Sequence, residues 1–363
     1  MLNIHPNFSM NSSKKLNYFF SFYFSIIIIT FRCFLFFLQS LLRFPVSFTS
    51  TFIRKSISDF FHAPILIPFI DTMLSLYFRL CNLSPCTVDL DDQTTMHFWT
   101  PNHRKINKPD LVIIHGYGGN SRWQFVHQVR ALSDRFNLYV PDLLFFGKSY
   151  SSRAERTDVF QGNCVAEGMR RLGVDRFTVF GISYGGFVAY QMAQMNPEAV
   201  EKVVIVNSGI SWSEKQKEWH LKRVGRRISG FLVPESPQDL RFLVCLSLSN
   251  SDFIRWAPDF MLHQFIEVMH TTHRKEQLEM VEYLLNKDTN PDIPSLTQES
   301  LIIWGDQDNI FPLDFAHQLH RNLGPKSRLE IIKNTGHAAN VEAPHQLNTL
   351  IKSFVLGQTQ ITP

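Results

Sequence analysis

Short, uninterrupted apolar runs recur along the chain from about residue 94, and longer segments with helical spacing of their apolar residues separate them. The runs are rich in Val, Ile, Leu and aromatic residues, which is typical of strands buried on both faces of a parallel sheet. We expect such strands at residues 111–114, 137–140, 177–180, 202–206, 301–304 and 329–332, after an alternating strand at 94–99. Helices are expected at residues 123–134, 158–171 and 187–193 and after Pro344. Alternating strands and helices predict an α/β fold with a mostly parallel, doubly wound sheet.

A long interval without a strand pattern separates the runs at 202–206 and 301–304. It contains amphipathic stretches, and we expect helices at residues 212–228, 240–249, 258–271 and 273–285. A helical insertion at this point would lie over the carboxyl ends of the strands, where α/β sheets place their sites. Residues 211–299 are therefore predicted to form a helical lid, and a separate helical domain unrelated to the site is the alternative.

The N-terminal pattern is different. Residues 18–42 are apolar except for Arg32, and the run is long enough to cross a bilayer as a helix. It is too long for the apolar part of a cleaved signal peptide, and no small-residue cleavage site follows it. An arginine near mid-membrane costs about 2.5–3.5 kcal/mol, which the surrounding Phe and Ile residues outweigh. We expect a membrane-associated, single-pass protein, with a spanning helix favoured over an interfacial one.

Residues 60–85 form a second apolar region, which three prolines interrupt. Asp71 and Arg79 make a second span less favourable, so we expect a linker with a helix that packs on the body or rests on lipid. The patterns together divide the chain into an N-terminal membrane-anchor segment and linker (1–85), a first part of the core (86–210), the lid (211–299) and a second part of the core (300–363).

The net charge of +4 belongs to the N-terminal segment. Seven of the 36 basic residues and two of the 32 acidic residues lie in 1–85, which leaves 29 basic and 30 acidic residues for the remainder. A body this close to neutral does not suggest nucleic-acid binding. The five cysteines are odd in number and lack C-x-x-C spacing, so they indicate neither a disulfide framework nor a zinc site.

Residues 181–186 (Gly-Ile-Ser-Tyr-Gly-Gly) follow a predicted strand and precede a predicted helix. A serine between glycines in this setting is typical of a nucleophile elbow. The turn leaves no room for side chains at 181 and 185, and it presents the Ser183 hydroxyl at the start of a helix, where negative charge is stabilised. A chance match is the alternative, and the strand and helix on either side argue against it.

A serine hydroxyl becomes a useful nucleophile only when an oriented base takes its proton. In proteins with a nucleophile elbow of this kind, the partners follow the serine in the order acid, then histidine, on loops after later strands. The acid candidates are Asp306 and Asp308, just past the strand at 301–304. The histidine candidate is His337, just past the next strand.

At these motifs the chain resembles the serine α/β-hydrolases, specifically lidded members such as monoacylglycerol lipases and esterases. The resemblance covers about residues 94–357. It is strongest at residues 115–119 (His-Gly-Tyr-Gly-Gly, the oxyanion loop), at 181–186 (the elbow), at 304–308 (Trp-Gly-x-x-Asp) and at 336–337 (Gly-His).

The resemblance implies an α/β-hydrolase fold and a role for each matching residue. Ser183 would be the nucleophile, His337 the general base and acid, and Asp308 the orienting carboxylate. Asp306 would then be a turn residue. The backbone N–H groups of Tyr117 and Tyr184 would form the oxyanion hole, and His115 would brace the loop.

One stretch departs from the family pattern. Residues 142–149 read Asp-Leu-Leu-Phe-Phe-Gly-Lys-Ser, whereas the family usually has Asp-x-Pro-Gly-x-Gly-x-Ser. Leu144 and Phe145 thus replace a turn-forming Pro and Gly, and we expect them to add apolar surface beside the pocket.

The sequence therefore predicts a serine hydrolase that cleaves carboxylic esters through an acyl-enzyme, on small-molecule substrates that are lipid-like, such as monoacylglycerols. The proton relay needs neither a metal nor an organic cofactor. A serine nucleophile argues against epoxide hydrolases and haloalkane dehalogenases, which use aspartate on the same fold. Two alternatives stay open: a ligand-sensing receptor with little turnover, and an acyltransferase or lyase that uses the same site.

Overall fold

The computed structural model describes residues 64–287 and 292–357, without the side chains of 219–221. The expected membrane anchor at residues 18–42 lies outside these ranges. Within them, no helix combines the length and the apolar character needed to cross a bilayer.

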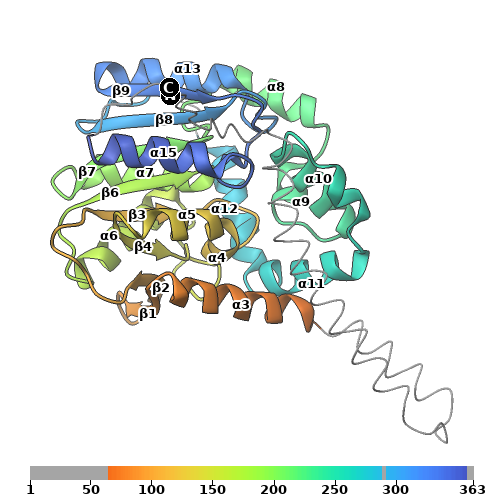
Figure 1. Ribbon diagram of the computed structural model, residues 1–363. Coiled ribbons are helices and arrows are strands. Elements are labelled where there is room, and N and C mark those ends of the chain that lie inside the picture. The colour runs from red at the N-terminus through yellow and green to blue at the C-terminus, as the bar shows by residue number, and fades with distance from the viewer. Residues whose placement is uncertain (1–63, 288–291, 358–363) are drawn as a thin grey trace, which may run out of the picture. The chain divides into compact units, whose positions relative to one another are not determined.

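The centre of the body is a nine-stranded sheet in the order β1-β2-β4-β3-β6-β7-β8-β9, with the short β5 paired to β2 (Figure 1). The strands are β1 (Leu83–Asp89), β2 (Thr94–Pro101), β3 (Asp110–Ile114), β4 (Asn137–Pro141), β5 (Tyr150–Ser151), β6 (Phe177–Ile182), β7 (Val200–Val206), β8 (Glu299–Gly305) and β9 (Ser327–Ile332). All pairs from β4 to β9 are parallel, and the pairs that involve β2 are antiparallel. The mostly parallel sheet is therefore confirmed. Because β1 begins at Leu83, the expected boundary at residue 85 falls inside a strand.

Helices cover both faces of this sheet. They are α3 (Leu66–Leu80), α4 (Ser121–Gln124), α5 (Val126–Leu132), α6 (Asp158–Arg171), α7 (Tyr184–Met195), α13 (Leu313–Leu323), α14 (Ala339–Glu342) and α15 (Pro344–Val355). The single helix expected at 123–134 is wrong in detail, because the chain breaks at Phe125 into α4 and α5. No helix was expected at α13.

Alternate residues of the central strands feed two separate cores. In β3, Val112 and Ile114 pack with residues of α6, α7 and α13, whereas Leu111 and Ile113 pack with residues of α3, α5 and α15. A continuous apolar run is needed because both faces of the strand are buried. The doubly wound arrangement follows from this.

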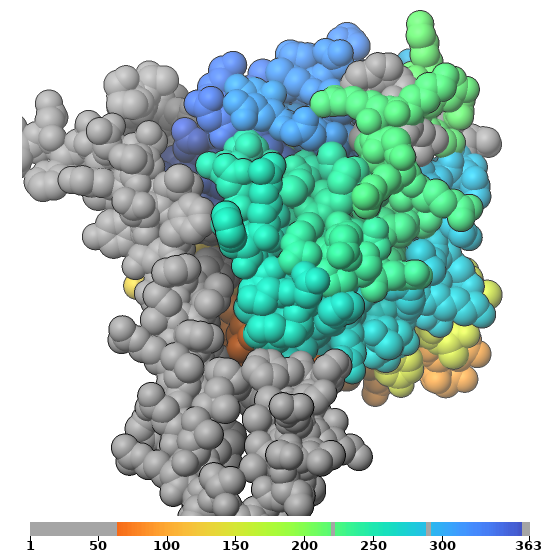
Figure 2. Space-filling model, turned by 90° about the vertical axis from the view of Figure 1, so that its right-hand side faces the viewer, coloured from red at the N-terminus to blue at the C-terminus, as the bar shows by residue number. Residues whose placement is uncertain are grey.

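The interval between β7 and β8 is helical, as expected. It contains α8 (Glu214–Val224), α9 (Ile228–Leu232), α10 (Pro237–Ser247), the 3₁₀ helix η1 (Asp252–Trp256), α11 (Asp259–His270) and α12 (Arg274–Asn286). These helices share a small core of their own, which includes Phe231, Leu243 and Val281. Figure 2, which looks onto the insertion, shows its green and cyan atoms covering this end of the body.

Candidate active site

Ser183 lies on the sharp turn between β6 and α7. Its backbone has φ 54° and ψ −122°, a conformation that a non-glycine residue rarely adopts. A Cβ at Gly181 would collide with the backbone of Gly185, and a Cβ at Gly185 would collide with the carbonyl oxygen of Ile114. Glycine is therefore required on both sides of the serine, as the elbow pattern predicts.

The structure brings three of the predicted site residues into one hydrogen-bonded line. His337 Nε2 lies 2.8 Å from Ser183 Oγ, and His337 Nδ1 lies 2.9 Å from Asp308 Oδ2. A carboxylate oxygen can only accept, so Nδ1 carries the proton and Nε2 can accept from the serine hydroxyl. This is the geometry that a serine–histidine–carboxylate proton relay requires.

Both oxygens of Asp308 are fixed by further donors. Oδ1 accepts the backbone N–H groups of Ile310 (2.7 Å) and Phe311 (2.8 Å), and Oδ2 also accepts Asn207 Nδ2 at 2.8 Å. Asn207 is not among the residues predicted from the sequence. Its position directly after β7, at the same sheet edge as the elbow, is the only sequence signal that points to it.

Asp306, the other acid candidate, lies elsewhere. Its Oδ1 accepts the N–H of Thr335 at 3.3 Å, and its Oδ2 lies 3.8 Å from Lys333 Nζ. Asp306 thus joins the turns after β8 and β9, and it is Asp308 that reaches His337.

The backbone at residues 116 and 117 runs against Ser183. A Cβ at Gly116 would lie 2.8 Å from Ser183 Cβ and 3.3 Å from its Oγ. Tyr184 is the first residue of α7, and N–H groups in a first turn have no acceptor within their own helix. Both predicted oxyanion donors, the N–H groups of Tyr117 and Tyr184, therefore belong to backbone that adjoins the serine.

The side chain of Gln124 fixes the loop that contains Tyr117. Its Oε1 accepts the N–H of Gly116 at 3.0 Å, and its Nε2 donates to the carbonyl oxygens of Gly116 (2.8 Å) and Tyr117 (3.1 Å). Sequence reasoning missed this residue, because nothing in the short α4 distinguishes it from a surface glutamine.

His115 braces the same loop, as expected. Its Nδ1 donates to the carbonyl oxygen of Gly116 at 2.8 Å, and its Nε2 accepts the N–H of Leu143 at 3.0 Å. Complete burial lowers the pKa of this imidazole. One nitrogen accepts from a backbone amide, so the ring is neutral and serves as a brace.

Leu144 and Phe145, which replace the Pro and Gly of the family pattern, do not have the expected position. Both side chains are buried in the core and do not line the cavity, so the expectation of added apolar surface beside the pocket is wrong. Phe145 adopts φ 71°, the left-handed conformation that a glycine usually provides. Its carbonyl oxygen accepts Gln277 Nε2 of α12 at 2.8 Å, which ties this loop to the insertion.

A cavity opens above Ser183 and His337, between the sheet and the insertion. The sheet side contributes Tyr117, Tyr184, Phe187, Ile310 and Phe311, and the insertion side includes Trp212, Ile228, Phe231, Leu243, Val281 and Leu285. None of the described lining residues is Asp, Glu, Lys or Arg. Burial raises the pKa of both tyrosines well above its usual range, so their phenols stay neutral. The cavity is suited to an uncharged, apolar group.

In the part of the chain that the structure describes, no cluster of His, Cys, Asp and Glu has the arrangement of a metal site.

A nucleophile elbow above a mostly parallel sheet, with an acid and a histidine on the turns after later strands, defines the class of α/β hydrolases. The chain belongs to the alpha/beta hydrolase fold family, whose model matches residues 109–344. It is a hydrolase of this family.

Several curated relatives are about one-quarter identical to this chain in sequence. An uncharacterized protein of Mycobacterium tuberculosis is 27% identical over 259 residues, which are 68% of this chain and 75% of that protein. A 2-hydroxy-6-oxononadienedioate/2-hydroxy-6-oxononatrienedioate hydrolase of a Pseudomonas species is 27% identical over 68% of this chain and 87% of its own length. A pimeloyl-acyl-carrier-protein methyl ester esterase of Nitrosomonas europaea is 27% identical over 66% of this chain and 93% of its own length.

Among solved structures, a membrane phospholipase A described as a bacterial virulence factor is similar with a TM-score of 0.69. It is 21% identical in sequence, and the match covers 89% of this chain and 98% of the phospholipase. At this identity the similarity shows the shared fold.

Proposed function

We propose that this protein is a serine hydrolase that cleaves carboxylic esters through an acyl-enzyme. Ser183 is the nucleophile, His337 the general base and then general acid, and Asp308 the carboxylate that orients the imidazole. The observation that carries the proposal is the pair of hydrogen bonds, 2.8 Å and 2.9 Å long, that join the three side chains.

In this mechanism Ser183 Oγ attacks the ester carbonyl carbon while its proton passes to His337 Nε2. The negative charge that develops on the carbonyl oxygen is stabilised by the N–H groups of Tyr117 and Tyr184. One such donor contributes about 2.7–4 kcal/mol to transition-state stabilisation. His337 then gives the proton to the leaving alcohol, and a water molecule activated by the same nitrogen releases the acid.

The proposed substrates are lipid-like esters, such as monoacylglycerols. The support is the apolar lining of the cavity, in which the described residues offer no Asp, Glu, Lys or Arg side chain to a polar acyl group. The insertion at residues 211–299 is proposed as a lid between the two parts of the core, 86–210 and 300–363, because it supplies about half of that lining.

Membrane association through residues 1–85 completes the proposal, with 18–42 as a single spanning helix. Its support is the length and composition of the run. A structural relative that is described as a membrane phospholipase A agrees with it. An enzyme held at a membrane has direct access to substrates that partition into lipid.

The test is labelling by a fluorophosphonate probe together with turnover of a panel of esters of increasing acyl length. The wild-type chain should be labelled and hydrolyse the longer esters, and Ser183→Ala should do neither while it keeps its circular dichroism spectrum. Turnover that survives in Ser183→Ala would refute the assignment. A labelled wild-type chain that turns over no ester would favour the receptor alternative, and an acylated alcohol among the products would favour the transferase.

A further inference from the structure

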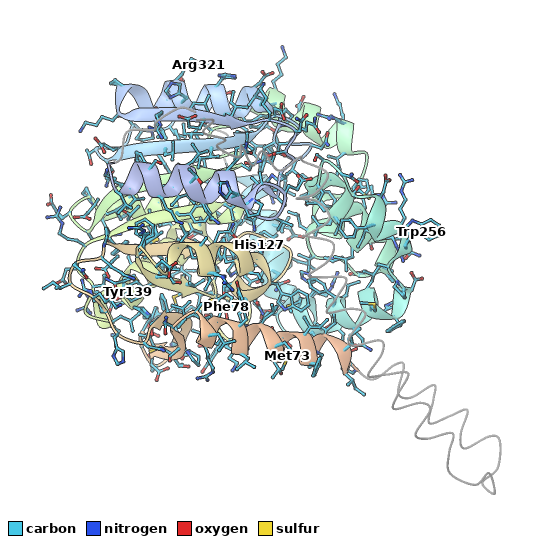
Figure 3. All side chains as sticks on the ribbon, in the orientation of Figure 1. Met73, Phe78, His127, Tyr139, Trp256 and Arg321 are labelled. Atoms are coloured by element: carbon cyan, nitrogen blue, oxygen red, sulfur yellow. The ribbon has the colours of Figure 1, made fainter. Side chains whose placement is uncertain are left out.

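Helix α3 has two apolar faces with different surroundings. On one face Ile67, Leu74 and Phe78 are buried against the body, and Phe78 lies between α3 and the sheet (Figure 3). The other face is open. Its large apolar residues, together with Ile65 directly before the helix, are here called the α3 stripe; they are Ile65 (48% exposed), Phe69 (48%), Met73 (38%), Leu76 (50%) and Leu80 (75%). Their spacing of three or four residues places them along one side of the helix.

The charged residues of α3 leave the α3 stripe uninterrupted. Asp71 is directed to the body, where its carboxylate lies 2.8 Å from the Arg122 guanidinium and accepts Trp123 Nε1 at 3.1 Å. Arg79 is exposed, and it lies in the last turn beside Leu80. The exposed face of α3 therefore contains no carboxylate, and its one cation is at its end.

We propose that the α3 stripe is an interfacial membrane-binding surface, with α3 lying in the plane of a phospholipid bilayer at the boundary between headgroups and acyl chains. A 15-residue helix is roughly 22 Å long, which is too short to span a bilayer and suited to lying along it. One apolar face, one buried face and a terminal arginine that can reach the headgroups fit such an orientation.

The size of the α3 stripe favours lipid over a protein partner. Five partly exposed side chains present a few hundred Å², the range in which an apolar patch marks an interaction site. A specific protein interface needs about 800 Å² from each partner, so a second copy of the chain would require more surface than α3 offers. Insertion into a bilayer does not require a minimum contact area of this kind.

The sequence before α3 also supports lipid as the partner of the α3 stripe. Residues 43–65, 23 in number, separate the apolar run at 18–42 from the start of α3 at Leu66, and they include Arg43, Arg54 and Lys55. Basic residues next to an apolar helix favour contact with phospholipid headgroups. The inference rests on the membrane association proposed above, and it adds a second contact within the folded body.

Two contacts connect α3 to the insertion and to α4. The backbone N–H of Leu66 donates to Gln264 Oε1 of α11 at 2.9 Å, and Asp71 holds Arg122 of α4. Figure 1 shows α11 beside the N-terminal end of α3, along one edge of the body. A bilayer that supports α3 would therefore also lie beside the insertion, which supplies part of the cavity lining.

Site-specific photocrosslinking in the full chain tests this proposal. A diazirine amino acid is placed at position 73 or 76, the chain is reconstituted in phosphatidylcholine vesicles, and the vesicles are floated and irradiated. Two control positions are Leu74, on the buried face of α3, and Ile106, which is fully exposed in the loop before β3. We expect mass spectrometry to detect lipid adducts at positions 73 and 76 and none at positions 74 and 106.

The other outcomes each overturn the inference. Crosslinks from position 73 to residues 18–42 would identify that segment as the occupant of the α3 stripe, and crosslinks to a second chain would identify a dimer. A chain that floats with the vesicles but forms only water adducts at 73 would leave the anchor in place and exclude the α3 contact. Since none of these readouts depends on ester turnover, a failure here is distinct from a failure of the hydrolase assignment.

Discussion

Asn207 Nδ2 donates to Asp308 Oδ2 at 2.8 Å, the same carboxylate oxygen that accepts His337 Nδ1. Asn207 is completely buried at the end of β7, with φ 48°. Its Nδ2 also donates to the carbonyl oxygen of Gly336 at 3.2 Å, and its Oδ1 accepts the N–H of Gly305 at 3.4 Å. One amide side chain thus connects the turn that contains the acid with the turn that contains the histidine.

Asn207→Ala should lower kcat for a soluble short-chain ester at least tenfold with little change in KM. A hydrogen bond to a charged group contributes about 1.5–3 kcal/mol, and each 1.4 kcal/mol in the barrier is about tenfold in rate. Asn207→Asp should be slower still, because a second carboxylate would face Asp308. Wild-type kcat in Asn207→Ala would show that the amide does not orient the carboxylate.

Gln124→Ala should lower kcat about tenfold or more through the oxyanion loop. The amide is the side chain that holds the carbonyl oxygens of Gly116 and Tyr117, so its loss lets the Tyr117 N–H leave its position beside Ser183. Gln128→Ala is the matched control, since Gln128 is buried one turn further on and donates to the carbonyl oxygen of Asn340. The control should lose thermal stability and keep kcat. Equal kcat losses in both variants would argue for a general packing effect.

Glu342→Gln should loosen the contact between the insertion and the histidine turn. Glu342 Oε1 accepts both the N–H (2.8 Å) and the Oγ–H (2.7 Å) of Ser249, and Oε2 accepts the N–H of Gly336 at 2.6 Å. In Glu342→Gln one of the two carboxylate oxygens is replaced by an NH₂ group. This group cannot accept a hydrogen bond, so the contact with either Ser249 or Gly336 is lost. We expect a severalfold lower kcat and faster hydrogen exchange at residues 249–250. Glu299→Gln, on the surface beside Lys202, should change neither.

The sheet was predictable because its central strands are buried on both faces, which leaves a continuous apolar signal at β3, β4, β6, β7 and β8. The strand β1 gave no such signal. It is an antiparallel edge strand in which only Leu83 and Val88 are buried, and it contains Pro85, a residue type that is uncommon within strands.

The three side chains of the proposed relay could be placed by their motifs, since each follows a predicted strand. Asn207 and Gln124 could not, because their roles arise from contacts that only the folded chain creates. Asn207 and Asp308 are 101 residues apart, and Gln124 matters only because α4 folds back on residues 116–117. The left-handed backbone conformation of Phe145 could not be predicted either. The missing Pro and Gly show that the loop at residues 142–149 differs from the family pattern, but they do not define its backbone conformation.

At position 145 a glycine variant should be more stable than an alanine variant, which is the reverse of the usual order. Both Phe145→Ala and Phe145→Gly remove a buried ring over which the Arg156 guanidinium lies at 4.6 Å, and either change should lower the free energy of unfolding by about 3 kcal/mol or more. At φ 71° alanine keeps the backbone strain and glycine removes it. Phe145→Gly should therefore be about 1 kcal/mol more stable than Phe145→Ala in urea unfolding. Greater stability of the alanine variant would mean that the loop is not strained.

His270 should make the fold sensitive to mild acid. It is completely buried in α11, its Nδ1–H donates to Gln277 Oε1 at 2.9 Å, and burial lowers the pKa of the imidazole to about 4, with a smaller contribution from the Arg274 cation. The unfolded chain binds this proton at its ordinary pKa of about 6.5. Between these two values the unfolded state holds more protons, so the free energy of unfolding falls as the pH falls.

The stabilising effect of the neutral ring is complete above about pH 6.5 and is lost progressively down to about pH 4, by about 3 kcal/mol in total. His270→Asn keeps a donor toward Gln277 and cannot titrate. Its urea midpoint should therefore change less between about pH 7 and pH 5 than the wild-type midpoint does. His263→Asn, on the same helix, is the control and should retain the wild-type slope. If His270→Asn follows the wild-type slope as well, then the acid sensitivity originates in another group.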